Sequence, residues 1–140
     1  MNVVYKFKPS IPYSLHDMRV SKIGVVENNI RLYFDYGYFK LEKPFYQIDG
    51  NILIENIDFD CSDVHFLSDN GSYGEFSGKK IKFLEFIKRY EDFSFEIIDE
   101  MYGYNSLIYL GYLSLPNREN LIYISIYLYY TGNIVYETTE

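Results

Sequence analysis

The segment LIYISIYLYY at residues 121–130 constrains the fold more than any other part of the sequence. From Ile122 to Tyr129 its aliphatic residues recur at every second position, and the residues between them are Tyr and Ser. Successive side chains of a β-strand point to opposite faces, so this period of two is typical of a strand with one buried face. We expect the buried face to be formed by Ile122, Ile124, Ile126 and Leu128, and the other face by Tyr123, Ser125, Tyr127 and Tyr129.

Further short strands, separated by turn signals, are predicted along the chain. Residues 18–26 and 30–36 flank Glu27-Asn28-Asn29, and they predict a hairpin because Asn tolerates positive φ. Asp49-Gly50 predicts a turn that opens a strand at about 51–60, with a partner strand at 63–68. The remaining predicted strands cover residues 2–8, 93–101, 105–115 and 134–137, and the composition of 68–78 predicts a loop.

One helix is predicted, at residues 79–91. At 100° per residue its apolar side consists of Phe83, Phe86, Ile87 and Tyr90, with Leu84 at the edge, and its opposite side consists of Lys82, Glu85, Lys88 and Arg89. Such an amphipathic helix is typical of one packed on a sheet. The sequence therefore predicts a single α+β domain spanning residues 1–140. Its sheet is mostly antiparallel, arranged as a sandwich or a partly open barrel-like sheet, with this helix covering it.

Size and composition indicate a protein that folds without disulfide bonds. The chain has 140 residues, of which 48% are hydrophobic, enough for one substantial core. Cys61 is the single cysteine, so it cannot form an intramolecular disulfide, which fits a reducing cytoplasm. Lysines and prolines interrupt the start of the chain, and no uncharged apolar run approaches the roughly 18 residues of a membrane helix. We expect a cytoplasmic protein without a membrane partner.

The net charge and its distribution along the chain limit the kinds of molecule that the protein is expected to bind. The net charge is −7, which disfavours nucleic acid because binding to nucleic acid depends on neutralising phosphates. Residues 55–75 contain six acids and no Lys or Arg, whereas 79–89 hold five of the thirteen basic residues. An acidic surface favours a basic protein partner, and tyrosines are enriched at interfaces. The predicted partner-binding residues are Glu55, Asp58, Asp60, Asp63, Tyr123, Tyr127 and Tyr129, although for these tyrosines a sheet surface half covered by neighbours is the favoured interpretation.

His16 and Asp17 form the sharpest polar pair in the sequence. An Asp can hold an imidazole in one tautomer, as base and metal sites require. However, adjacent residues in an extended chain point to opposite faces. We therefore favour a structural role, in which Asp17 bonds backbone N–H groups where the chain enters the 18–36 hairpin.

The segment DFDCSDVH at 58–65 holds the other histidine and the cysteine. Cys61, Asp63 and His65 could share one face of a strand as three metal ligands, but no CxxC or HxxxH spacing supports this, so no metal site is predicted. A nucleophilic Cys61 would need a base, which only folding could supply from His16 or His65. NGSYGEFSG matches neither a phosphate-binding nor a dinucleotide-binding loop, and no cofactor is predicted.

Two stretches resemble a pattern found in small uncharacterised bacterial domains. They are LHDMRV at 15–20 with the following hairpin ending in IRLYF, and IYLYYTGNIVYE at 126–137. Some of these domains are similar to immunity proteins, which neutralise a toxin by binding it. The resemblance implies a bacterial, cytoplasmic, non-catalytic domain and transfers no catalytic residues.

The leading prediction is thus a protein-binding domain, of the immunity-like kind, that inhibits a basic partner. The alternative is a small ligand-binding domain or enzyme that uses His16, Asp17, Cys61 and His65. A third possibility is a homo-oligomer that joins aromatic strand edges.

Overall fold

The computed structural model describes residues 3, 11–68 and 78–139. Most of the strand predicted at 2–8 and most of the loop predicted at 68–78 lie outside these residues. The strands are β1 (Tyr13–Ser14), β2 (Arg19–Val26), β3 (Asn29–Phe34), β4 (Tyr38–Lys40), β5 (Gln47–Ile48), β6 (Gly50–Ile54), β7 (Asp63–Ser68), β8 (Lys79–Lys82), β9 (Ser94–Gly103), β10 (Ser106–Ser114), β11 (Ile122–Tyr129) and β12 (Ile134–Thr138), and the helices are the 3₁₀ helix η1 (Phe59–Cys61) and α1 (Phe83–Arg89).

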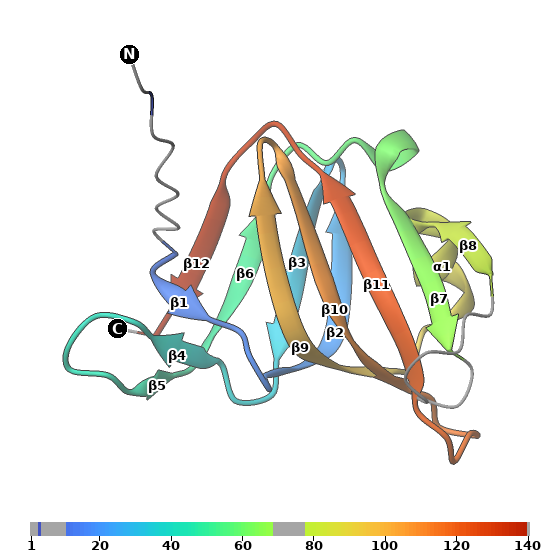
Figure 1. The fold of residues 1–140 in the computed structure, drawn as a ribbon, viewed down its shortest axis with the longest axis horizontal. Coiled ribbons are helices and arrows are strands. Elements are labelled where there is room, and N and C mark those ends of the chain that lie inside the picture. The colour runs from blue at the N-terminus through green and yellow to red at the C-terminus, as the bar shows by residue number, and fades with distance from the viewer. Residues whose placement is uncertain (1–2, 4–10, 69–77, 140) are drawn as a thin grey trace.

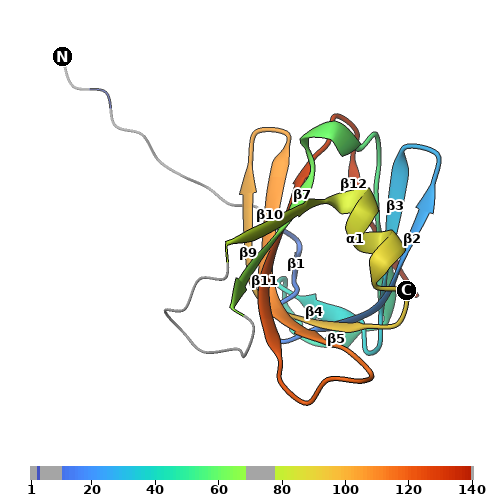
Figure 2. The ribbon, with the colours of Figure 1, turned by 90° about the vertical axis from the view of Figure 1, so that its right-hand side faces the viewer.

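The architecture is a curved antiparallel sheet with one α-helix, which confirms the predicted α+β class. Nine strands pair in the order β12-β6-β3-β2-β9-β10-β11-β7-β8, and the sheet is not closed into a barrel. It curls around an apolar core, while α1 covers one side and the small sheet β1-β4-β5 lies at the opposite end (Figures 1 and 2). Within the described residues, no helix is long and apolar enough to cross a membrane.

Two halves of the large sheet meet at a narrow seam. β2 and β9 pair through only Arg19↔Glu96 and Val20↔Phe95. On one side of the seam β2 and β3 form the predicted hairpin, with Val26↔Asn29 as its last pair and positive φ at Glu27 rather than at an Asn. On the other side β9, β10 and β11 run as long neighbouring strands.

The core confirms the alternation in 121–130. Ile122, Ile124, Ile126 and Leu128 are at most 3% exposed. Phe83 and Phe86 of α1 are fully buried, as the predicted apolar side requires, and Phe86 lies 6.3 Å from the Phe66 ring of β7. The amphipathic helix therefore packs on the concave side of the sheet, where it closes the core.

The predicted boundaries of this helix were wrong at its start. Residues 79–82 form β8, which pairs with β7 through Asp63↔Lys82 and His65↔Lys80, and α1 begins at Phe83. Within β8 Ile81 is half-buried between exposed lysines, which is the alternation of an edge strand. Pairing with β7 therefore overrides the helical pattern in these four residues.

Two further details differ from the sequence prediction. The strand predicted at about 51–60 ends at Ile54, and Asn56 has a φ of 53°. The strand at 63–68 forms as predicted but pairs with β11 and β8, whereas β6 pairs with β3 and β12. The chain between Ile54 and Asp63 therefore crosses from one half of the sheet to the other.

Candidate protein-binding face

The side chains that β9, β10, β11 and β7 direct away from the core form one continuous surface, here called the outer face. Its uncharged centre consists of Met101, Ile108, Leu110, Tyr112, Tyr123, Ser125, Tyr127, Tyr129 and His65, and the registers place Asp63, Glu96 and Asp99 on the same side. The strand registers place these residues side by side, for example Ile108↔Tyr127, Leu110↔Ser125 and Tyr112↔Tyr123. The Tyr112 and Tyr123 rings lie with their centroids 5.4 Å apart.

The outer face is apolar although no described helix or strand lies over it (Figures 1 and 2). An antiparallel sheet with one solvated face normally alternates between apolar and polar residues. In β10, however, Leu107, Tyr109 and Leu113 fill the core. The outward positions between them are again large and apolar: Ile108, Leu110 and Tyr112. Met101 is 46% exposed beside them. A contiguous, partly exposed surface of large apolar and aromatic side chains is typical of an interaction site.

The predicted tyrosines are therefore part of a larger face. Tyr123, Tyr127 and Tyr129 are half-buried on it. Sequence reasoning missed Met101, Ile108, Leu110 and Tyr112. The sequence LIYLGYL at 107–113 contains the signal that could have found them. A strand buried on one face alone has polar residues at every second position, and this stretch has none of that alternation.

Charged residues lie only at the borders of the outer face. β10 and β11 contain no Asp, Glu, Lys or Arg. On one border β8 carries Lys80 and Lys82, whose ammonium groups lie 3.9 and 3.7 Å from the carboxylate of Asp63. On the other border β9 carries Asp99 and Glu96, and Glu96 lies 3.5 Å from Arg19 of β2.

The acidic residues predicted to bind a partner have structural contacts of their own. The Asp58 carboxylate accepts hydrogen bonds from the backbone N–H groups of Asp60 and Cys61, and so caps η1. Asp63, whose side chain is 14% exposed, faces two lysines. Glu55 is half-buried and Asp60 is exposed. Asp69 and Glu75 lie outside the described residues. The acidic stretch is therefore partly neutralised by β8, which lies beside it.

His16 and Asp17 lie in a tight turn between β1 and β2. Asp17 has a φ of 64°, and its backbone N–H donates to the carbonyl of Ile97 at 2.7 Å. The His16 imidazole Nδ1 contacts the Ile98 carbonyl, and its Nε2 lies 3.4 Å from the Asp17 carboxylate. The pair thus fixes the start of β2 against β9. The partner of the Asp17 carboxylate is the imidazole rather than the backbone N–H groups that we expected.

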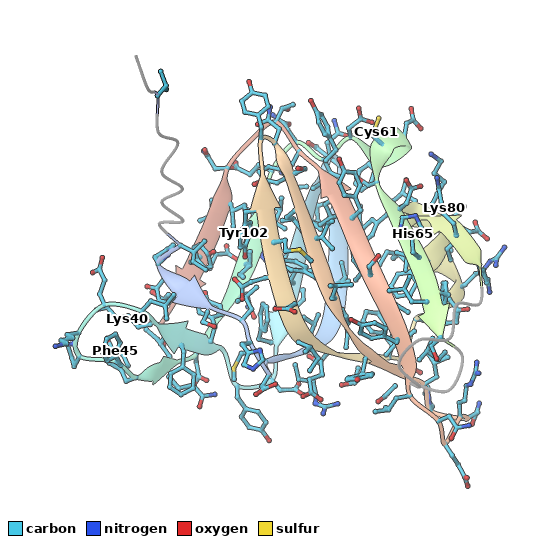
Figure 3. All side chains as sticks on the ribbon, in the orientation of Figure 1. Lys40, Phe45, Cys61, His65, Lys80 and Tyr102 are labelled. Atoms are coloured by element: carbon cyan, nitrogen blue, oxygen red, sulfur yellow. The ribbon has the colours of Figure 1, made fainter. Side chains whose placement is uncertain are left out.

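Cys61 and His65 occupy a different part of the molecule. Cys61 ends η1 and is exposed, and His65 lies midway along β7 with its Nδ1 3.3 Å from the Ser125 hydroxyl (Figure 3). The turn that carries His16 lies at the opposite end of the sheet from η1 (Figure 1). Within the described residues, no three His, Cys, Asp or Glu side chains are arranged to hold a metal ion.

The thiol of Cys61 is also electrostatically unsuited to act as a nucleophile. A hydrogen bond to Asp58 and the negative charge of that carboxylate raise the pKa of the thiol, and Lys82 opposes this only in part. The thiolate is the reactive form of a cysteine, so Cys61 is held in its less reactive state.

A polar cluster inside the sheet was not foreseen from the sequence. The Tyr102 hydroxyl donates to the Glu100 carboxylate at 2.8 Å, and the backbone N–H of Leu15 donates to its other oxygen at 2.6 Å. Burial raises the pKa of Glu100 and the pKa of Tyr102, and it raises the pKa of Tyr136 to about 12. These phenols therefore stay neutral. The cluster ties the β1–β2 turn to β9 and presents no exposed base.

The shallow hollows among the described residues include two that lie where β9 begins and β10 ends. One has a volume of about 370 Å³ and is lined by Ser21, Asp92, Phe93, Ser94, Ser114, Leu115 and Pro116. The other, of about 340 Å³, shares Asp92, Leu115 and Pro116. Neither includes His16, Asp17, Cys61 or His65, so the residues of the predicted enzyme site do not line either hollow.

Comparisons with known proteins identify no relative: no family model, no curated protein and no solved structure matches this chain.

Proposed function

We propose that this chain is a non-catalytic protein-binding domain that acts by covering a surface of another protein, as an immunity-like inhibitor does. The observation that carries the proposal is that β10 is apolar on both faces while only one face packs on the core. Desolvating a surface of this kind is favourable, by about 25 cal/mol per Å² of apolar area removed from water. The half-buried tyrosines beside it add rigid contact area with polar tips.

The partner that this domain fits is a basic protein. A net charge of −7 attracts a cationic molecule over a distance of several ångströms and raises its association rate. Asp99 at one border and Asp60 in η1 supply exposed negative charge. We place this activity in the bacterial cytoplasm, where a chain with one cysteine needs no disulfide for stability.

The positions of the polar residues favour binding over catalysis. His16 and Asp17 brace a turn, Cys61 has a raised pKa, and His65 contacts a serine hydroxyl on the sheet surface. A hydrolytic or transfer reaction needs a nucleophile and a base within hydrogen-bond reach of each other. His16 and Asp17 share one turn, whereas Cys61 ends η1 and His65 lies in β7, and this separation supports a surface-based mechanism.

The test compares variants of the outer face with a matched control. The wild-type chain is used to recover binding proteins from a bacterial lysate, and each recovered protein is then purified and titrated by calorimetry. We expect Met101→Asp and Leu110→Asp to weaken binding about tenfold or more, the equivalent of 1.4 kcal/mol. Leu41→Asp, at a 42% exposed position between β4 and β5, is the control and should bind like the wild type.

Two results would contradict the proposal. One is a stoichiometric complex whose affinity is the same for the wild type, Met101→Asp and Leu110→Asp. The other is a failure of every purified candidate to bind. Unfolding midpoints of the variants establish that each one is folded, and Met101→Asp is the safer variant because its side chain is 46% exposed. For a basic partner, the association rate should also fall as salt is added.

A further inference from the structure

We infer that a second copy of this chain covers the outer face, so that the protein forms a symmetric dimer when no other partner is bound. The inference rests on the proposed function in one respect, namely that the outer face is a binding surface. It goes further by naming an occupant, and the arrangement of charges around the face is what identifies that occupant.

One row of side chains crosses five neighbouring strands. The registers align Lys80 of β8, His65 of β7, Ser125 of β11, Leu110 of β10 and Asp99 of β9. The row therefore begins with a cation, ends with an anion and has uncharged residues in the middle. With strands about 4.8 Å apart, Lys80 and Asp99 stand about 19 Å apart on the same surface. Lys80 and His65 lie beside each other at one border of the face (Figure 3).

A two-fold axis that runs along β11 through Ser125 makes this row complementary to itself. Because such an axis exchanges the two borders, Lys80 of one copy faces Asp99 of the other, and the reverse pair forms at the opposite border. Leu110 of each copy faces His65 of the other copy. Protein interfaces usually have charged residues at the rim and uncharged residues at the centre. A two-fold dimer also requires a surface that is complementary to itself, as this row is.

The next row supports the same arrangement. It aligns Lys82, Asp63, Tyr127, Ile108 and Met101. About the same axis, the aliphatic stem of Lys82 covers Met101 of the second copy, and the two copies of Tyr127 meet near the axis. About the same axis Asp63 lies opposite Ile108 of the second copy. Its carboxylate keeps Lys80 and Lys82 within 4 Å, although its buried Oδ1 accepts no hydrogen bond within the described residues.

Self-association through this face has a regulatory consequence. The dimer covers the residues that the proposed function assigns to partner binding. A partner protein must therefore displace the second copy, and its apparent affinity falls as the concentration of the chain rises.

The test is sedimentation velocity on the purified chain over a series of concentrations. We expect a reversible monomer–dimer equilibrium in the wild type. Asp99→Lys should raise the dimer dissociation constant about tenfold or more, because it places like charges at both borders. The double variant Asp99→Lys with Lys80→Glu should restore dimerisation. Glu42→Lys makes the same charge change at an exposed position outside the face, and it should leave the equilibrium unchanged.

Three outcomes would overturn the inference: a wild type that is monomeric at every concentration, a dimer that Asp99→Lys leaves intact, or a double variant no more dimeric than the single one. Asp99 and Lys80 are exposed, but Lys80→Glu also removes the ion pair with Asp63, so the unfolding midpoint of each variant is measured beside its dimerisation. If the wild type is monomeric but Leu110→Asp still weakens binding of a purified partner, the dimer is refuted and the proposed function stands. If the chain dimerises but the outer-face variants bind a partner as the wild type does, the dimer stands and the proposed function is refuted.

Discussion

Gly111 is a position at which a single added methyl group should damage the fold severely. It lies where the β9–β10 register shifts, and a Cβ atom added there would stand 1.9 Å from the carbonyl oxygen of Glu96 and 3.1 Å from the Phe95 ring. The oxygen belongs to the backbone of the neighbouring strand, so it cannot rotate away. Overpacking a core costs about 1–3 kcal/mol, and we expect Gly111→Ala to cost about 3 kcal/mol because the strand itself must move.

The assay is urea unfolding, with Gly24→Ala as the matched control. A Cβ atom on Gly24 would meet nothing closer than a ring carbon of Tyr33 at 3.4 Å. Gly24 is not among the glycines with positive φ, so alanine there should stabilise the protein by up to about 1 kcal/mol through the unfolded state. A Gly111→Ala protein within about 0.5 kcal/mol of the wild type would refute the register that we describe for β9 and β10.

The remaining predictions concern single polar groups. Burial raises the pKa of Glu100, so the native state keeps the carboxyl proton to higher pH than the unfolded chain does. The unfolding free energy should therefore fall as pH rises above the ordinary pKa of 4.5. Urea titrations at several pH values should show this fall in the wild type and not in Glu100→Gln. Cys61 should react slowly with a thiol reagent because Asp58 raises the pKa of its thiol. Asp58→Asn keeps the cap of η1 but removes the charge, so it should shift the pH–rate profile of Cys61 to lower pH. Identical profiles for the wild type and Asp58→Asn would mean that Asp58 does not raise this pKa. Tyr38→Phe removes a buried hydroxyl that donates to the Asn51 carbonyl at 2.8 Å and should cost about 1 kcal/mol by thermal unfolding, so an unchanged midpoint would mean that this bond contributes nothing.

Local patterns predicted local structure well. The alternation in 121–130 specified both faces of β11, and Glu27-Asn28-Asn29 specified a hairpin, because strand period and turn chemistry depend on neighbouring residues only. The apolar side of α1 was also correct. Its start was not, since residues 79–82 fit both a helix and an edge strand, and only the presence of β7 beside them decides between the two.

Pairing between distant segments could not be read from the sequence. Nothing in 63–68 distinguishes β11 from β6 as a partner, although the two choices place β7 in different halves of the sheet. The three-stranded sheet β1-β4-β5 consists of strands of two or three residues, too short to show a period.

The candidate site was predicted in part. The tyrosines of β11 were predicted, whereas Met101 and the outward residues of β10 were not, because LIYLGYL at 107–113 shows no alternation of apolar and polar residues. Their place on an uncovered face depends on the absence of a second layer, which is a property of the whole fold. The acidic residues Asp58 and Asp63 were chosen for their charge, but their contacts with η1 and β8 exist only in the folded chain.

The most direct measurement of the central claim is site-specific photo-crosslinking in cells that produce the protein at a low level. A crosslinking phenylalanine analogue replaces Ile108 at the centre of the outer face, or Glu42 in the β4–β5 loop as the control. Our account predicts a discrete crosslinked protein band from position 108, from a second copy or another partner, and none from position 42. No band from position 108, or equal bands from both positions, would contradict the claim that the outer face is a binding surface.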